Sequence, residues 1–259
     1  MAALPSLRFL LSLIGALVCA LVLAACGGDG GGEQQGDLTA REMTDDELVL
    51  MLLPKAEMGE QYAGLSFVYD PGLRTASDIT DAALDPEEEA EDLQRFPLIS
   101  ASGVVYAEST IAEELGEPAG QTVAFAVHLF EDPDAASGYL EEELADWEGQ
   151  VGAMRTGKRH WDSKLTAAER FKPGRIGDES RGIRFTLTYF IDPSSPIDVH
   201  ATEVWFRRGR LLASASISTT FGNPDVREAA EALARKLDER IQAVLRGELT
   251  PTPAGEPGT

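Results

Sequence analysis

The sequence predicts an α+β domain in which helices pack on an antiparallel sheet. Several segments alternate apolar and polar residues with a period of two, which is typical of half-buried strands. Other segments repeat apolar residues three and four positions apart, as amphipathic helices do. The two cysteines, Cys19 and Cys26, both precede these segments, so we expect a hydrophobic core rather than disulfides to stabilise the domain. A body of about 200 residues is long enough to bury such a core.

The N-terminal segment has the three zones of a secretory signal. Arg8 precedes an apolar run, Phe9–Leu23, and small residues follow up to Cys26. The sequence Leu23-Ala24-Ala25-Cys26 resembles the bacterial lipobox, which implies a diacylglycerol on the thiol of Cys26 and cleavage directly before it. The alternative is an uncleaved transmembrane helix, but the run is shorter than the roughly 20 residues that a span needs.

The lipobox resemblance sets the expected organisation of the chain. Residues 1–25 form the signal peptide, and residues 26–40 hold the lipidated cysteine and a flexible Gly-rich tether. Residues 41–247 form a single α+β domain, and residues 248–259, rich in proline and glycine, are expected to be disordered. The expected location is therefore extracytoplasmic, with acyl chains on Cys26 in a lipid bilayer. Whether that bilayer is an inner or an outer membrane stays open.

Two helices are predicted in the first half of the domain. Thr44 and Glu47 form a capping box ahead of an apolar run that ends at Pro54. Residues 76–93 are predicted to be helical in their second half, where Pro86 stands in the first turn and acidic residues follow it.

Two further helices are predicted from apolar stripes. Asp134 precedes the first of them, and the second is expected to begin with Asn223 as its cap and Pro224 in its first turn, and to end at Gly247. The stripes consist of Ala136, Leu140, Leu144 and Trp147, and of Val226, Ala230, Leu233, Leu237, Ile241 and Leu245.

The strands are predicted from alternation. Residues 102–108, 123–130 and 183–191 each read as a strand, and residues 202–206 and 211–217 flank the turn Arg207-Arg208-Gly209-Arg210 as a β-hairpin. In residues 123–130 the apolar face holds the odd-numbered residues, and His128 shares the other face with Ala124 and Ala126. Ser214, Ser216 and Ser218 are interpreted as the polar or packing face of the last strand.

The second half of the chain resembles extracytoplasmic lipoproteins and kinase sensor domains of high-GC bacteria. The resemblance covers residues 121–247 and rests on Phe130-x-Asp132-Pro133-x-Ala135-Ala136, Ile176-Gly177-Asp178-Glu179, Trp205-Phe206-Arg207-Arg208-Gly209 and the final helix. Such domains are similar in outline to the PsbP-like fold. The resemblance implies a fold and supplies no catalytic residue.

The net charge of −22 is unevenly distributed. An acidic chain of this kind argues against nucleic-acid binding, which needs clustered Lys and Arg. Residues 155–184 are the exception, with an excess of basic side chains. Lys158, Arg159, His160 and Trp161 are the candidate surface contacts of this stretch, for anionic lipid or an acidic ligand. The simpler interpretation is that the stretch neutralises the protein's own acidic helices.

No motif predicts catalysis or a cofactor. The three histidines, His128, His160 and His200, have no metal-ligand spacing. Asp132 and Asp134 lack the loop glycine of a calcium site and read as the end of a strand and a helix cap. There is no Gly-x-Ser-x-Gly elbow, and the expected mature protein has no thiol besides Cys26, although a pair of glycosidase carboxylates stays open.

We therefore expect a non-catalytic, membrane-anchored module that binds a protein partner or a small or lipidic ligand. The alternative is a carrier that shields a lipid or another apolar ligand in a cavity between sheet and helices. A hydrolase ranks third.

Overall fold

Strands from both halves of the chain join in one antiparallel sheet. In the computed structural model, residues 39–82, 86–108, 120–156, 162–192, 195–220 and 225–251 are described. They form an eight-stranded sheet of order β1-β2-β3-β8-β7-β6-β5-β4. The strands are β1 (Leu65–Arg74), β2 (Leu98–Glu108), β3 (Gln121–Phe130), β4 (Met154–Thr156), β5 (Asp162–Phe171), β6 (Glu179–Asp192), β7 (Ser195–Arg208) and β8 (Leu211–Thr219). The predicted α+β class is confirmed.

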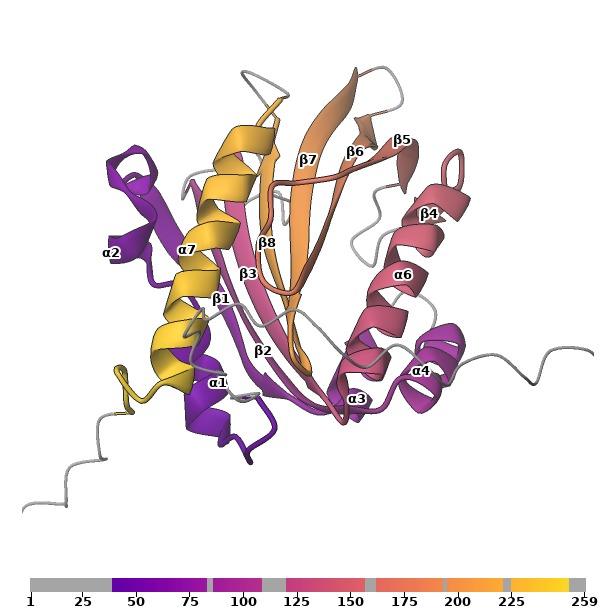
Figure 1. Cartoon of the computed structure of the whole chain (residues 1–259). Helices are drawn as coiled ribbons and strands as arrows, with labels where there is room; N and C mark the ends of the chain where they lie inside the picture. The colour runs from indigo at the N-terminus through magenta and orange to yellow at the C-terminus, as the bar shows by residue number, and fades with distance from the viewer. Residues whose placement is uncertain are drawn as a thin grey trace, which may run out of the picture. The chain divides into compact units, whose positions relative to one another are not determined.

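Short helices precede β1 or connect it to β2, and two long helices flank the sheet on opposite faces (Figure 1). The helices are α1 (Asp45–Met51), α2 (Lys55–Met58), a 3₁₀ turn (Glu60–Tyr62), α3 (Ala76–Ala82), α4 (Pro86–Arg95), α6 (Pro133–Gly149) and α7 (Arg227–Leu245). None of the helices in the described ranges has the length and apolarity to cross a bilayer.

Local sequence signals explain most helix ends. Thr44 and Glu47 complete the predicted capping box at α1, with each side chain accepting from the other residue's backbone N–H. The Asp132 carboxylate accepts from the N–H of Ala135, so α6 begins at Pro133, before Asp134. The prediction for α7 was wrong at its start. The helix begins at Arg227 after the cap position Val226, and residues 223–224 lie outside the described ranges.

The larger hydrophobic core lies between α7 and the sheet. Odd-numbered β3 residues, Phe125 and Val127 among them, pack with Phe206 of β7 and with the predicted α7 stripe, of which Leu237 is fully buried. Helix α1 adds Leu48 and Met51 to the same cluster. Period-two strands and a 3.6-period helix therefore bury their apolar faces against each other, as the sequence predicts.

The opposite face of the sheet carries a smaller core beneath α6, α3 and α4. Phe130, Trp205 and Leu212 of the sheet pack against Tyr139 and Leu140 of α6. The Trp147 ring of the same helix stacks on Phe185, with centroids 4.3 Å apart. Between these contacts the sheet residues on this face are small.

The chain enters the domain at the β7–β8 hairpin, whose presence confirms the prediction. Thr39 is buried there, and its hydroxyl and carbonyl accept hydrogen bonds from the backbone N–H and the guanidinium of Arg210. Gly209, at φ +54°, turns the chain; a Cβ at this position would lie 1.8 Å from the Thr39 hydroxyl oxygen. Behind the hairpin, Arg208 binds Asp238 of α7 through two hydrogen bonds of 2.7 and 2.9 Å.

Candidate functional site

The centre of the α6 face is built from small side chains. In the sheet register, Ala126 lies between Gly103 and Ser214, and Ala124 lies between Val105 and Ser216. Because alanine, glycine and serine fill little volume, the helices that cover this face do not close on the sheet here. A cavity of about 330 Å³ results, bounded at the β1 side by Arg74 and by Ile79 of α3. His128, Glu203 and Ser214 are among the polar residues of its sheet wall, which also includes Ser102 of β2.

His128 lies in this wall, on the face predicted from the strand alternation. Its ring stacks on Trp205, with centroids 5.9 Å apart and planes at 30°, and lies 6.2 Å from the Tyr139 ring. Burial lowers the pKa of His128 to about 4, although the Leu212 backbone opposes this change. The imidazole is therefore neutral at pH 7. Its Nδ1 atom has no hydrogen-bond partner among the described residues.

Glu203 of β7 brings a carboxyl group to the same cavity. The residue is partly accessible, and this accessible surface faces the cavity that it lines. Burial raises the pKa of Glu203 to about 7, opposed by the neighbouring Ser214 hydroxyl and Trp205 indole. The Trp205 Nε1 atom is itself buried and reaches hydrogen-bond geometry with no acceptor in the described ranges. Glu203 therefore changes charge near neutral pH.

A second carboxyl, that of Glu143 on α6, lies near Glu203 on the side toward α4. The Tyr139 hydroxyl lies 3.0 Å from the Glu143 carboxylate and 3.4 Å from that of Glu89. Burial raises the pKa of Glu143 to about 7, and the charges of Glu203, Glu89 and Asp146 add to the increase. Neither Glu203 nor Glu143 forms an ion pair with a described residue. Two acidic groups are thus held without a counter-charge.

Chemically, the cavity offers a carboxyl that titrates near neutrality, a serine hydroxyl and a neutral imidazole. These groups can accept and donate hydrogen bonds to a polar ligand and can hold a positive charge. The described residues contain no group of three or more His, Cys, Asp or Glu side chains that could bind a metal ion.

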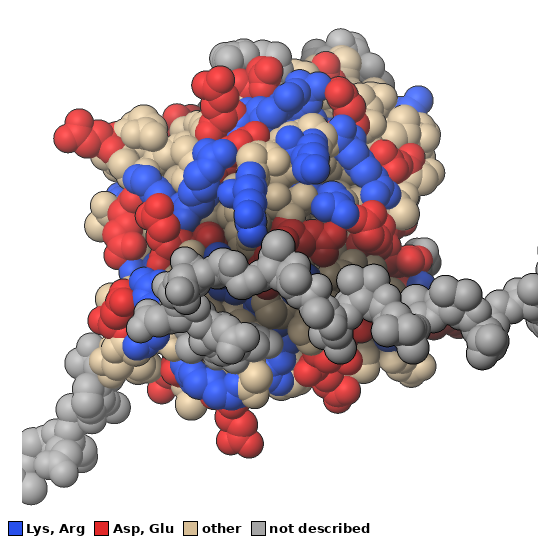
Figure 2. Space-filling view, in the orientation of Figure 1, with Lys and Arg blue, Asp and Glu red and all other residues tan. Residues whose placement is uncertain are grey.

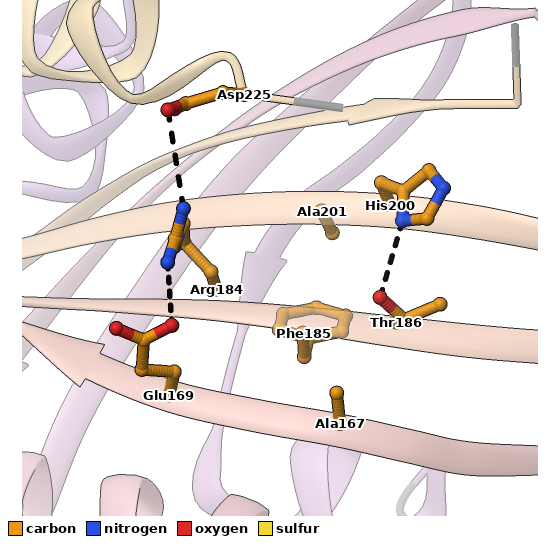
Figure 3. A pocket seen from close by; sticks show the side chains of 8 residues that line it. All are labelled: Ala167, Glu169, Arg184, Phe185, Thr186, His200, Ala201 and Asp225. Atoms are coloured by element: carbon orange, nitrogen blue, oxygen red, sulfur yellow. Dashed lines mark hydrogen bonds and ion pairs between the residues drawn. The ribbon is translucent and has the colours of Figure 1, made fainter. Parts of the chain in front are cut away.

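A second hollow, of about 220 Å³, lies over β5, β6 and β7 (Figure 3). On one side of it the Arg184 guanidinium lies 2.5 Å from Glu169 and 3.9 Å from Asp225. Thr186 and His200 are joined by a hydrogen bond of 3.1 Å. Two carboxylates already neutralise the Arg184 guanidinium. This hollow therefore offers a ligand fewer unpaired polar groups than the first cavity does.

The contacts predicted at Lys158, Arg159, His160 and Trp161 lie outside the described residues, as does Cys26. Other arginines of the basic stretch do neutralise the protein's own acids. Arg170 pairs with Glu141 and Glu148 of α6, and Arg181 pairs with Glu141. Figure 2 shows basic and acidic side chains interspersed over one face of the domain. For these arginines the simpler interpretation is confirmed.

Sequence reasoning missed both carboxyls of the cavity. Glu203 stands two positions before Trp205, so strand alternation places it on the same buried face. Glu143 follows Tyr139 by four residues, which places both on one side of α6. The signal in the sequence was therefore a glutamate at a position where the strand or helix period predicts a buried apolar residue. His128 and Ser214 were placed on the correct face but were not associated with a cavity.

Comparisons with known proteins add a likeness of fold. No family model and no curated protein matches the chain. Among solved structures, the extracellular domain of PknH from Mycobacterium tuberculosis is similar, with a TM-score of 0.51 and 11% sequence identity. The likeness covers 78% of this chain and 98% of that domain. At this identity it concerns the fold alone, which is thus one that an extracellular domain also adopts.

Proposed function

We propose that the protein is a lipid-anchored extracytoplasmic module whose domain binds a small polar ligand without catalysing its conversion. The observation that carries this proposal is the cavity beside Glu203, with its convergent polar groups. At about 330 Å³ it falls at the small end of the range for ligand pockets, roughly 300–1,000 Å³. Side chains with strongly shifted pKa values in a cavity are a further mark of functional sites.

The polar side chains set in a mostly apolar lining favour this proposal over a lipid carrier. An acyl chain in the cavity would cover the Glu203 carboxyl and the Ser214 hydroxyl without offering either a hydrogen bond. Each buried polar group left unsatisfied costs about 1–3 kcal/mol. The groups that line the cavity therefore select for a ligand with polar atoms of its own.

The proposed anchor is supported by the lipobox and by the place where the chain enters the domain. Thr39, thirteen positions after Cys26, is held by Arg210 at the β7–β8 hairpin. Thirteen residues span at most about 45 Å when fully extended. A lipid on Cys26 would therefore keep the hairpin end of the domain within that distance of the bilayer. The likeness to an extracellular domain is compatible with this location.

Two experiments test the proposal. Native mass spectrometry of the soluble domain, residues 27–259, purified without refolding from its own host, should show a bound species of small mass. The variant Ala126→Leu, which fills the cavity, should lose that species while keeping its thermal unfolding midpoint within a few degrees. An equal adduct on both proteins, or none on either, contradicts ligand binding in this cavity. Metabolic labelling with a radioactive fatty acid should mark the full chain and fail to mark Cys26→Ala.

A further inference from the structure

We infer that the ligand of this cavity carries an ammonium group, which binds against the Glu203 carboxylate. The inference rests on the proposed ligand binding and names the chemical class of the ligand. It draws on three features of the cavity: a carboxyl without a counter-charge, an imidazole nitrogen without a partner, and the distribution of charge around them.

The Glu203 carboxyl has the position of a ligand-binding group. It projects from the middle strands of the sheet into the cavity, and in the described part of the chain no Lys, Arg or His pairs with it. Its polar neighbours on the same face are the Ser214 hydroxyl and the Trp205 indole. A primary ammonium has three donors, so it can donate to the Glu203 carboxylate and to the Ser214 oxygen together.

A second unpaired polar group lines the same cavity. The buried Nδ1 atom of His128 has no hydrogen-bond partner among the described residues. Its ring stacks on Trp205, which is 7% exposed. A ligand with several polar donors, such as an ammonium group, can therefore reach more than one unsatisfied group of this wall.

The remaining ionisable groups around the cavity do not supply the missing positive charge. Helices α6 and α4 contribute Glu143, Asp146 and Glu89, which are acidic, together with the Tyr139 hydroxyl. His128, from β3, is neutral at pH 7.

The guanidinium groups nearest in the fold act elsewhere. Arg74 lies at the β1 end of the cavity, where its charge acts on Asp78, and it does not contribute to the shifted pKa of Glu203. Arg181 of β6 is paired with Glu141 and Glu179. An ammonium group on the ligand would therefore be the counter-charge of Glu203.

The binding of an ammonium requires the ionised form of Glu203, so affinity should depend on pH. With a pKa of about 7, roughly nine-tenths of the carboxyl is ionised at pH 8 and roughly 3% at pH 5.5. The apparent affinity scales with this fraction. It should fall about thirtyfold between these two values, while an alkylamine itself stays protonated throughout.

The test is a titration of the ¹⁵N-labelled domain, residues 27–259, with n-butylamine and 1,4-diaminobutane, and with 1-butanol as the neutral analogue. Shifts should concentrate on backbone amides of the cavity wall, at Gly103, Ala126 and Ser214, and the apparent Kd should rise about thirtyfold from pH 8 to pH 5.5. Glu203→Gln should abolish the amine shifts. Glu131→Gln, which removes an exposed carboxylate next to β3, should bind as the wild type does.

Several results would overturn the inference. One is amine binding by Glu203→Gln with unchanged Kd, and another is an affinity that stays equal at both pH values. If 1-butanol shifts the cavity amides and the amines do not, the cavity still binds ligand and the ammonium assignment is wrong. If native mass spectrometry also shows no bound species, the proposed function fails as well. Retention of the wild-type spectrum outside the cavity verifies that Glu203→Gln is folded.

Discussion

Replacing Glu203 with glutamine should stabilise the domain at alkaline pH and leave its stability unchanged at acid pH. The substitution keeps the shape of the side chain and removes its ability to ionise. In the folded protein, burial raises the pKa of Glu203 from 4.5 to about 7. The ionised form is therefore disfavoured in the folded state relative to the unfolded chain, and the wild type loses stability wherever that form must exist.

The magnitude follows from linkage. Below pH 4.5 the carboxyl is protonated in both states and costs nothing. Between pH 4.5 and 7 the unfolded chain loses this proton while the folded domain retains it, so the free energy of unfolding falls as the pH rises. Above pH 7 the loss is complete, and at 1.36 kcal/mol per pKa unit it amounts to about 3 kcal/mol. The contacts of the carboxylate with the Ser214 hydroxyl and the Trp205 indole are already contained in this pKa, so the expected gain for Glu203→Gln is about 3 kcal/mol.

Urea unfolding at pH 5 and pH 8 measures this effect. Glu203→Gln should raise the free energy of unfolding by about 3 kcal/mol at pH 8 and by much less at pH 5. In Glu131→Gln, the free energies of unfolding at pH 5 and pH 8 should differ by the same amount as in the wild type. If Glu203→Gln were less stable than the wild type at pH 8, the carboxylate would have a stabilising partner, and the account of an unpaired charge would be refuted.

Two further substitutions test the hairpin end of the domain. At Gly177, with φ +59°, a Cβ would lie 2.3 Å from a backbone carbonyl oxygen, so Gly177→Ala should cost about 2 kcal/mol in urea unfolding. Gly64→Ala, where a Cβ meets nothing within 4 Å, should stay close to the wild type; an equal loss at both positions would contradict the steric reason. Arg208→Ala leaves Asp238, 8% exposed, without its guanidinium, and should cost about 3 kcal/mol. The control is Arg246→Ala, which removes an exposed ion pair and should leave the urea midpoint unchanged. If Arg208→Ala also left the midpoint unchanged, Arg208 and Asp238 would not form a stabilising buried pair.

The sequence predicts the central strands and the long helices because their burial is one-sided. In β3 the odd residues face α7 and the even residues face α6, so the alternation is clean. Strands at or next to an edge of the sheet give a weaker signal. Strand β1 contains Pro71 and Gly72 and pairs with β2 in an irregular register, a pattern tolerated at the edge of a sheet. In β5 few side chains are buried, so no apolar stripe marks it, and both strands escaped prediction.

The cavity could not be predicted for a different reason. The cavity forms where small residues of three strands become neighbours. The register in which the strands pair decides which residues meet, and no local sequence pattern reveals that register. Ala126 meets Gly103 on one side and Ser214 on the other, from strands far apart in the sequence. Glu203 and Glu143 approach each other because α6 packs over β7. Each residue is unremarkable in its own segment, and the site arises from their combination.

A crystal structure of the soluble domain, purified from its own host without refolding or added ligand, tests the central claim most directly. The account predicts electron density larger than water in the cavity beside His128, with a polar atom within about 3 Å of the Glu203 carboxyl. Ordered water alone in the cavity, or side chains of α3 folded into it, would contradict the proposal that this domain exists to bind a small ligand there.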